Sequence, residues 1–245
     1  MRLQGKFVLV TGAARRVGRA VAMALARRGA RLIIHYNRSR REAQRLVSEA
    51  EDLCGREASL AQADLSDLRQ VRRMTDGLLR RFGTVHVLVN SASLYERTPF
   101  GRVEAADWDS HLDVNLRAPF FLSQALGPAM KKAGEGKIVN IADWAAQRPY
   151  ADYVPYCVSK AGLLCLNTAL AKALAPEVQV NALLPGPVLL PESFTARQRE
   201  AVREATLVKR LGTPEDVAQA VLFLIEGSDF VTGAALTVDG GRLVA

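Results

Sequence analysis

Residues 7–18, FVLVTGAARRVG, join a short apolar run to a glycine-containing turn, and a run with helical spacing follows over residues 19–28. The aliphatic residues at 7–10 favour a buried strand, and the later spacing favours a helix. Gly12 permits a tight turn, and Gly18 permits close packing of the helix on the strand. The start of the helix offers free N–H groups and a positive dipole end to a phosphate. The turn lacks the Gly-Lys-Ser/Thr sequence of a P-loop, which disfavours nucleoside triphosphate hydrolysis.

The rest of the chain repeats this alternation of short apolar runs and longer segments with helical spacing. The runs predict seven strands, at residues 7–10, 31–35, 58–63, 85–90, 137–142, 179–184 and 234–238. Between the second and third runs, Ser39 and Glu42 form the S-x-x-E pattern of a capping box before an amphipathic helix. Alternating strands and helices require crossovers, so we predict an α/β, doubly wound Rossmann fold. A single domain over residues 1–245 would contain a seven-stranded parallel sheet with helices on both faces.

The composition is that of an ordinary soluble globular chain. Of 245 residues, 49% are hydrophobic and 24% are charged, which excludes a disordered or collagen-like chain. The net charge of +8 comes from dispersed basic residues, so we expect a small phosphorylated ligand rather than a nucleic acid. The three cysteines and three histidines fit no metal-ligand spacing. The sequence shows no signal-peptide region and no run near the roughly 18 apolar residues of a membrane helix, so we expect a cytoplasmic protein without a metal or a membrane partner.

The second predicted strand ends in the sequence His35-Tyr36-Asn37-Arg38-Ser39. A site for NAD usually carries an acidic residue at this point for the ribose 2′-hydroxyl, whereas an arginine accommodates a 2′-phosphate. The first carboxylate after this strand is Glu42, while Arg38 and Ser39 could hold a phosphate through a charged donor and a hydroxyl. The sequence therefore predicts NADPH as the cofactor. For Ser39, the alternative is an N-cap role at the following helix.

A tyrosine and a lysine follow the fifth predicted strand at a spacing that places both on one helix face. Tyr156 and Lys160 are four residues apart, and Asp143 lies at the carboxyl end of that strand. Doubly wound sheets bind ligands at the carboxyl ends of their strands, so we expect these three side chains to meet the cofactor there. The spacing alone is weak evidence, because such a pair also arises by chance.

With these motifs the chain resembles the short-chain dehydrogenase/reductase family over essentially its whole length. The resemblance rests on several motifs in the family's order: Thr11-Gly12 with Gly18, Asp64, Asn90-Ser91-Ala92, Asn115, Tyr156-Cys157-Val158-Ser159-Lys160, Pro185-Gly186 and Val238-Asp239-Gly240-Gly241. It implies that the cofactor is held by Gly12, Arg15, Arg16, Val17, Gly18, His35, Tyr36, Asn37, Arg38, Ser39, Asp64, Leu65, Asn90, Ser91, Ala92, Tyr156, Lys160, Pro185 and Gly186. The resemblance also implies a homotetramer.

Two departures from the family pattern are informative. Most of the family has glycine or alanine where this chain has Arg16, and serine where it has Asp143. Both changes resemble the pteridine reductase branch, in which an Asp, Tyr and Lys site reduces a pterin with NADPH. That resemblance implies catalytic roles for Asp143, Tyr156, Lys160 and Asn115, the last supporting a water chain, and substrate contacts for Arg16, Ser93, Tyr95, Asp143 and Tyr156. It also implies a substrate loop over residues 189–206, which includes Glu192.

The chemistry of a carboxyl group at position 143 favours a pterin over a ketone as the substrate. A serine hydroxyl can donate to a ketone oxygen as it becomes an alkoxide, whereas an ionised carboxylate would repel the developing charge. In a pterin the hydride goes to a ring carbon and the proton to a ring nitrogen, so a carboxyl group that retains a proton is useful. We expect Lys160 to lower the pKa of Tyr156 toward the working pH and to hold the nicotinamide ribose.

Two other functions stay open at this point. The first is an NADPH-dependent carbonyl reductase, such as a 3-oxoacyl-(acyl-carrier-protein) reductase, in which Asp143 is a tolerated substitution. The second is a nonenzymatic NADP-binding sensor or a nucleic-acid-binding protein, which would use the fold and the basic charge. The presence of Tyr156 and Lys160 counts against the second function.

Overall fold

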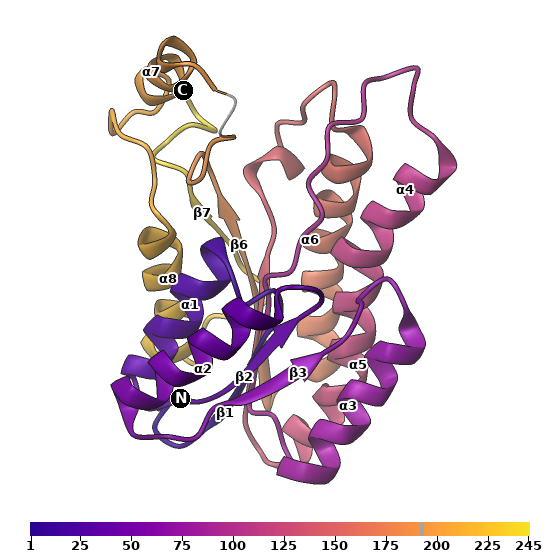
Figure 1. Cartoon of the computed structure of the whole chain (residues 1–245), viewed down its shortest axis with the longest axis vertical. Helices are drawn as coiled ribbons and strands as arrows, with labels where there is room; N and C mark the ends of the chain where they lie inside the picture. Colours follow the sequence, from indigo (N-terminus) through magenta and orange to yellow (C-terminus); the bar gives the residue numbers. More distant parts are fainter. Residues whose placement is uncertain (192–193) are drawn as a thin grey trace.

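The computed structural model describes residues 1–191 and 194–245 and contains a seven-stranded parallel sheet (Figure 1). The strand order is β3-β2-β1-β4-β5-β6-β7. The strands are β1 (Phe7–Val10), β2 (Arg31–Tyr36), β3 (Ser59–Gln62), β4 (Val87–Asn90), β5 (Gly136–Ile141), β6 (Val178–Pro185) and β7 (Ala235–Val238). The predicted doubly wound sheet of seven strands is confirmed, with small shifts at the strand ends. Glu192, predicted to belong to the substrate loop, lies outside the described residues.

Helices cover both faces of the sheet. In Figure 1, α1, α2 and α8 lie on one side, and α3, α5 and α6 lie on the other. The helices are α1 (Arg16–Arg27), α2 (Arg40–Cys54), α3 (Leu68–Phe82), α4 (Ala105–Leu112), α5 (Ala118–Lys132), α6 (Val154–Leu174), α7 (Ala196–Glu204) and α8 (Pro214–Leu222). The predicted substrate loop is therefore partly helical, because α7 falls within it.

Neighbouring residues of the central strands pack into opposite helical layers. In β1, Val8 and Val10 belong to the buried cluster shared with α1 and α8, whereas Leu9 belongs to the cluster shared with α3 and α5. In β2, Ile34 packs in the first of these clusters and Ile33 in the second. Because both faces are covered by helices, these strands read as continuous apolar runs in the sequence.

The longest described helix, α6, is partly buried in the fold. By length and composition alone its 21 residues could cross a membrane, so the expectation that no segment approaches a membrane helix is wrong. Its Tyr156, Lys160 and Leu163 are buried, and the helix packs against β6 and α5. Its buried face accounts for part of the apolar composition of α6, whereas Val158, Ala161 and Cys165 lie on an exposed face of the helix.

The direction of the chain connections reverses between β1 and β4, which are neighbours in the sheet. In a sheet of this kind, ligands bind in the crevice outside the carboxyl ends of the strands at such a point. Thr11, directly after β1, joins the two strand ends, because its Oγ1 accepts hydrogen bonds from Ser91 N at 2.9 Å and Ala92 N at 3.0 Å. The turns after β1, β4 and β5 are therefore where a site is expected.

Candidate active site

The turn after β1 brings backbone close to backbone. Gly12 adopts a φ of +63°, and a Cβ at this position would lie 2.9 Å from Ala92 Cα. A Cβ on Gly18 would lie 2.3 Å from the Gly12 carbonyl oxygen. These separations leave no room for a side chain, so the turn requires glycine at both positions. Because α1 begins directly after the turn, its first N–H groups are available to an anion at the strand ends.

Arg16 adopts an unusual backbone conformation in this turn. Its φ of +53° lies in the left-handed region, which costs a residue with a side chain about 1 kcal/mol. Its Nη2 donates to the Leu189 carbonyl oxygen at 3.4 Å. Arg16 thus connects the turn to the start of the predicted substrate loop, and α1 begins at this residue rather than at residue 19. Strained residues of this kind cluster at functional sites.

His35 is buried beneath the turn. The Gly12 N–H donates to His35 Nδ1 at 3.1 Å, and Nε2 donates to the Ala63 carbonyl oxygen at 3.1 Å. These partners select the neutral tautomer with hydrogen on Nε2. Burial lowers the pKa of His35 from 6.5 to about 4. Both ring nitrogens are occupied, so the predicted role of His35 in cofactor binding is corrected to one of holding the turn against the end of β3.

We predict that His35 makes the folded protein sensitive to mild acid. Because its pKa is lower in the folded chain, the unfolded chain takes up a proton first, and stability is lost as the pH falls from 6.5 to about 4. This difference in pKa corresponds to about 3 kcal/mol. A His35→Asn variant keeps an acceptor for Gly12 without a titrating ring. In urea unfolding, the stability advantage of the wild type over this variant should shrink by about 3 kcal/mol across that range, and parallel pH curves would contradict the prediction.

A cavity of about 530 Å³ lies beside the turn, at the ends of β1 and β2. It is lined by Gly12, Ala14, Arg15, Tyr36, Asn37, Arg38, Ser39, Ser66, Leu94, Glu96, Ser110 and Val114. The sequence predicted Gly12, Arg15 and residues 36–39 as neighbours of the cofactor. Ala14 belongs to the same turn as Gly12, whereas the lining residues at 66, 94, 96, 110 and 114 were missed, because only the fold brings their segments to this place.

The start of α2 in this cavity fits an anion. Ser39 is the N-cap residue of α2, yet in the described part of the chain its hydroxyl makes no capping hydrogen bond. The predicted capping box is wrong, because Glu42 forms an ion pair with Arg15 instead. Arg38 and Ser39 both line the cavity, and Ser39 directly precedes the first turn of the 15-residue helix α2. Such a set of donors suits a phosphate.

The remaining predicted cofactor residues lie at the same strand ends, but several of them are engaged with the protein. Asp64 Oδ1 accepts from Ser66 N at 3.0 Å and from Ser66 Oγ at 2.7 Å, and these hydrogen bonds lower the pKa of Asp64. Asn90 donates to Asn140 Oδ1 at 2.8 Å inside the sheet, and Leu65 is buried in the core. Of the others, Val17 lies in the first turn of α1, Ser91 and Ala92 follow β4, Gly186 follows β6, and Pro185 ends β6.

Two residues from the end of β5 and the start of α6 are in direct contact. Tyr156 donates its hydroxyl to Asp143 Oδ2 at 2.7 Å, and Ala145 N donates to Asp143 Oδ1 at 2.7 Å. Burial raises the pKa of Asp143, although these two hydrogen bonds act in the opposite direction. A carboxyl group in such a setting retains its proton to a higher pH than a surface aspartate.

Lys160 lies beside this pair, but the predicted lowering of the pKa of Tyr156 is wrong. Lys160 is buried; its Nζ donates to the Ile141 carbonyl oxygen at 2.8 Å and lies 5.8 Å from the centre of the Tyr156 ring. Burial lowers the pKa of Lys160 to about 8. Burial and the negative charge of Asp143 raise the pKa of Tyr156 well above its usual value. Tyr156 is therefore a neutral phenol with a proton to donate.

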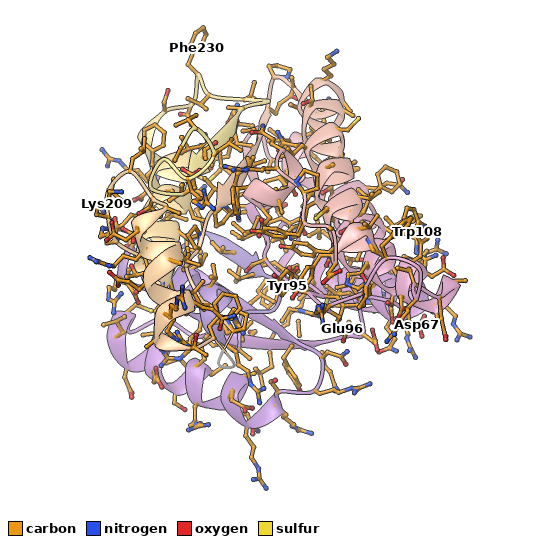
Figure 2. All side chains as sticks on the ribbon, turned by 90° about the horizontal axis from the view of Figure 1, so that it is seen from above. Asp67, Tyr95, Glu96, Trp108, Lys209 and Phe230 are labelled. Carbon is orange, nitrogen blue, oxygen red and sulfur yellow. The ribbon has the colours of Figure 1, made fainter. Side chains whose placement is uncertain are left out.

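Tyr95 adds an aromatic surface next to this pair. Its ring stacks on Tyr153 with the ring centres 4.6 Å apart and the planes 8° apart, and it meets the Tyr156 ring edge-on at 4.7 Å. Tyr95 is 46% exposed, and Figure 2 shows it near the middle of the molecule seen from above. Ser93, predicted to contact the substrate, stands just before it and donates to the Leu94 carbonyl oxygen at 3.4 Å.

The segment that carries Tyr95 is held on both sides. Before it, Asn115 binds both backbone groups of Leu94: its Oδ1 accepts from N at 2.8 Å and its Nδ2 donates to O at 2.9 Å. After it, Arg97 forms a two-pronged ion pair with Asp152, at 3.0 and 2.6 Å. The side chain of Asn115 thus positions this segment, and its predicted support of a water chain stays a prediction.

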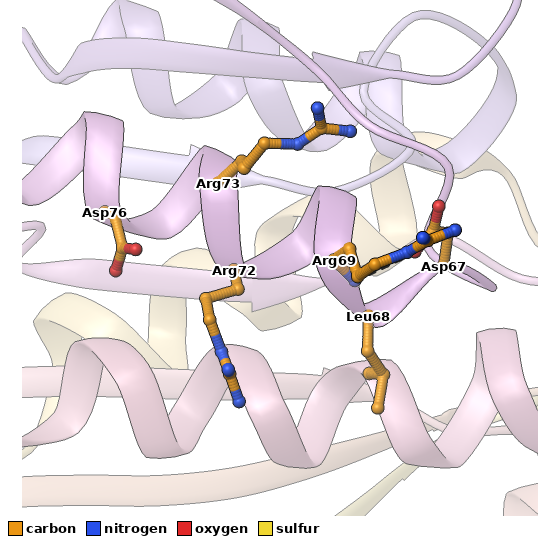
Figure 3. Close-up of a pocket in the computed structure, with 6 residues that line it drawn as sticks. All are labelled: Asp67, Leu68, Arg69, Arg72, Arg73 and Asp76. Carbon is orange, nitrogen blue, oxygen red and sulfur yellow. Dashed lines mark hydrogen bonds and ion pairs between the residues drawn. The ribbon is translucent and has the colours of Figure 1, made fainter.

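A second hollow, of about 580 Å³, lies on the surface of α3. It is lined by Asp67, Leu68, Arg69, Arg72, Arg73 and Asp76. Figure 3 shows Arg72 and Arg73 pointing in opposite directions, so their guanidinium groups do not converge on one ligand. Arg69 lies against Asp67 at 3.5 Å. This arrangement fits a solvated helix surface better than a binding site.

Known proteins resemble this chain over almost its whole length. The family model described as Enoyl-(Acyl carrier protein) reductase matches residues 12–242. The chain is 34% identical to the 3-oxoacyl-(acyl-carrier-protein) reductase of Thermotoga maritima, covering 100% of both proteins. It is also 34% identical to the D-threitol dehydrogenase of Mycolicibacterium smegmatis, covering 99% of this chain and 95% of that enzyme. Among solved structures, a gluconate 5-dehydrogenase from Burkholderia cenocepacia in complex with NADP and tartrate matches with a TM-score of 0.92 and 31% identity, over 100% of this chain and 97% of the other.

Proposed function

This chain belongs to the short-chain dehydrogenase/reductase family, and from that premise we propose that it is an NADPH-dependent reductase of a pterin. The substrate would be a 7,8-dihydropterin or dihydrofolate, reduced to the tetrahydro form. The observation that carries the proposal is the 2.7 Å hydrogen bond from Tyr156 to Asp143, a partly buried carboxyl where most of the family has serine. Asp143, Tyr156 and Lys160 are the proposed catalytic residues.

The cofactor would be held by groups along the strand ends. The turn at Gly12 and the start of α1 suit a pyrophosphate, and Arg38 with Ser39 suits a 2′-phosphate. Lys160 would hold the nicotinamide ribose. When bound, NADPH supplies the hydride for the reaction. The complex of the Burkholderia gluconate 5-dehydrogenase with NADP supports this cofactor.

The protein's own part in the reaction would be to deliver a proton to the ring nitrogen of the substrate. Tyr156 keeps its proton because burial and Asp143 raise its pKa. Asp143, whose pKa burial also raises, could return a proton to Tyr156 through the hydrogen bond that joins them. The Ala145 N–H holds the other oxygen of this carboxyl, which keeps the group in position.

The aromatic surface at Tyr95 supports a flat substrate. Tyr95 and Tyr153 are stacked, and the segment around Tyr95 is fixed by Asn115 and by the ion pair of Arg97. A fixed and partly exposed ring can stack on a planar heteroaromatic molecule. An acyclic ketone would gain less from such a surface than a pterin.

A second candidate is an NADPH-dependent carbonyl reductase. The names of the relatives favour this candidate, because the Thermotoga relative is a 3-oxoacyl-(acyl-carrier-protein) reductase. Tyr156 would then donate its proton to the ketone oxygen. The contact of Asp143 with Tyr156 supports the pterin instead, because a carboxyl with a raised pKa can return a proton to Tyr156 after the ring nitrogen has taken one.

Loss of NADPH absorbance with two substrates separates these candidates. Purified protein is assayed with 7,8-dihydrobiopterin and, in parallel, with an acetoacetyl thioester. Turnover of the dihydropterin at the higher kcat/KM is the result expected from the proposal. Turnover of the thioester alone would assign the protein to the carbonyl reductases, and oxidation of NADPH with neither substrate would count against both candidates.

We also propose the homotetramer and the cytoplasmic location that the sequence predicts. Exposed aromatic side chains such as Phe120 on α5 and Phe230 offer apolar surface to a second copy of the chain. Light scattering coupled to size-exclusion chromatography would measure the assembly, and a monomer in solution would contradict it.

A further inference from the structure

Two arginine–glutamate ion pairs join the first turns of α1 to α2. Arg15, which precedes α1, pairs with Glu42, and Arg19 pairs with Glu49 further along the same two helices. Arg15 lines the cavity at the ends of β1 and β2, and among the described residues neither member of the second pair does so. The two pairs are chemically alike but differ in their distance from the cofactor cavity.

Glu42 lies in the first turn of α2, at the position where the glutamate of a capping box normally binds the helix backbone. In a capping box, the glutamate of the S-x-x-E pattern binds the backbone N–H of the N-cap residue. Here the Glu42 carboxylate binds the Arg15 guanidinium, which lowers the pKa of that carboxyl. In the described structure the Ser39 hydroxyl likewise makes no hydrogen bond that caps α2. Arg15 and Ser39 could each donate a hydrogen bond to a phosphate, but their present partners differ. Arg15 is already paired with the Glu42 carboxylate, whereas the Ser39 hydroxyl makes no capping hydrogen bond in the described structure.

We propose that Glu42 is a specificity-determining residue that weakens the binding of 2′-phosphorylated dinucleotides. This inference rests on the proposed use of NADPH. A 2′-phosphate at the start of α2 gains the charge of Arg15 only by displacing the Glu42 carboxylate. The phosphate also meets the negative charge of Glu42 at short range. A dinucleotide without the phosphate makes no demand on Arg15, so Glu42 leaves its affinity unchanged.

The consequence is a moderate preference for NADPH over NADH. Arg38 and Ser39 attract the phosphate, while Glu42 offsets part of that attraction. Glu42 also provides a partner for Arg15 as the oxidised cofactor leaves.

Calorimetric titration with two nucleotides measures this effect without catalysis. Adenosine 2′,5′-bisphosphate and adenosine 5′-monophosphate differ only by the 2′-phosphate. We expect Glu42→Gln to tighten the binding of the bisphosphate about threefold, the scale of an exposed ion pair, and to leave the monophosphate unchanged. Glu49→Gln removes the neighbouring pair on the same helices and is the matched control, with no expected change for either nucleotide.

A double variant assigns the gain to Arg15. In an Arg15→Gln background, Glu42→Gln should lose most of its effect on the bisphosphate, because the two residues act through one contact. An unchanged affinity of Glu42→Gln for the bisphosphate, or the same gain in Glu49→Gln, would overturn the inference about Glu42 alone. A wild-type protein that binds both nucleotides equally would overturn the proposed 2′-phosphate site itself, together with this inference.

Discussion

The Asp143→Asn variant is expected to lose about 10² to 10⁴ in kcat for reduction of a 7,8-dihydropterin. Asparagine has nearly the shape of aspartate, and its Oδ1 can still accept the hydrogen bond from Ala145 N, while its Nδ2 takes the place of the oxygen that accepts from Tyr156 and would donate to that hydroxyl instead. It has no carboxyl proton to return to Tyr156, so the resupply of the proton donor is lost while the geometry is kept. The measurement is the loss of NADPH absorbance at saturating dihydrobiopterin.

The pH dependence tests the same prediction independently. Burial raises the pKa of Asp143, and the protonated carboxyl is the form that can donate. In the wild type, kcat/KM should therefore fall as the pH rises through this raised pKa, and the variant should lack that limb of the profile.

Stability provides the control for the Asp143→Asn variant. A folded-state pKa above the unfolded value means that the contribution of the protonated carboxyl is complete at low pH and is lost as the pH rises through the folded pKa. The asparagine variant should therefore be at least as stable as the wild type at pH 7. A variant that folds and keeps the wild-type kcat would rule out the proposed part of Asp143 in proton delivery.

The sheet could be predicted from the sequence because its strands are short aliphatic runs buried on both faces. Val8, Leu9 and Val10 pack into two helical layers, which leaves a run of three apolar residues as the signal. The ends of the strands were predicted less accurately. Val85 is as buried as a strand residue, yet β4 begins only at Val87.

Burial of polar groups could not be predicted, and it changed the interpretation of two site residues. His35 stands beside residues 36–39, which line the cavity, so the sequence does not reveal that its ring turns under Gly12. The spacing of Tyr156 and Lys160 placed the two residues together correctly. It carried no information on the burial that raises the pKa of Tyr156 and lowers that of Lys160.

Contacts between loops that are distant in the sequence could not be predicted either. Arg97 and Asp152 are 55 residues apart, and each stands in a loop with no periodic pattern. Their ion pair and the hydrogen bond from Thr98 N to the Asp152 carbonyl oxygen, at 2.7 Å, depend on the path of the chain after β4 and β5. The position of Tyr95 follows from these contacts.

Replacing Tyr156 by phenylalanine is expected to lower kcat by about 10² to 10⁴ with a dihydropterin and with a ketone alike, because both candidate reactions take their proton from this hydroxyl. The phenyl ring keeps the edge contact with Tyr95, so the aromatic surface and the KM for a flat substrate should change little. Tyr153→Phe is the matched control: it removes a hydroxyl from the same cluster and preserves the stack with Tyr95.

A large loss in Tyr156→Phe beside a small one in Tyr153→Phe identifies one hydroxyl as the proton donor. Equal losses in the two variants would instead mean that the aromatic cluster binds the substrate through several hydroxyls and that the donor lies elsewhere. A Tyr156→Phe enzyme that keeps its kcat with the dihydropterin would assign the donation to Asp143 itself. Asp143 is the carboxyl that shares the hydrogen bond with Tyr156, and burial leaves it able to hold a proton.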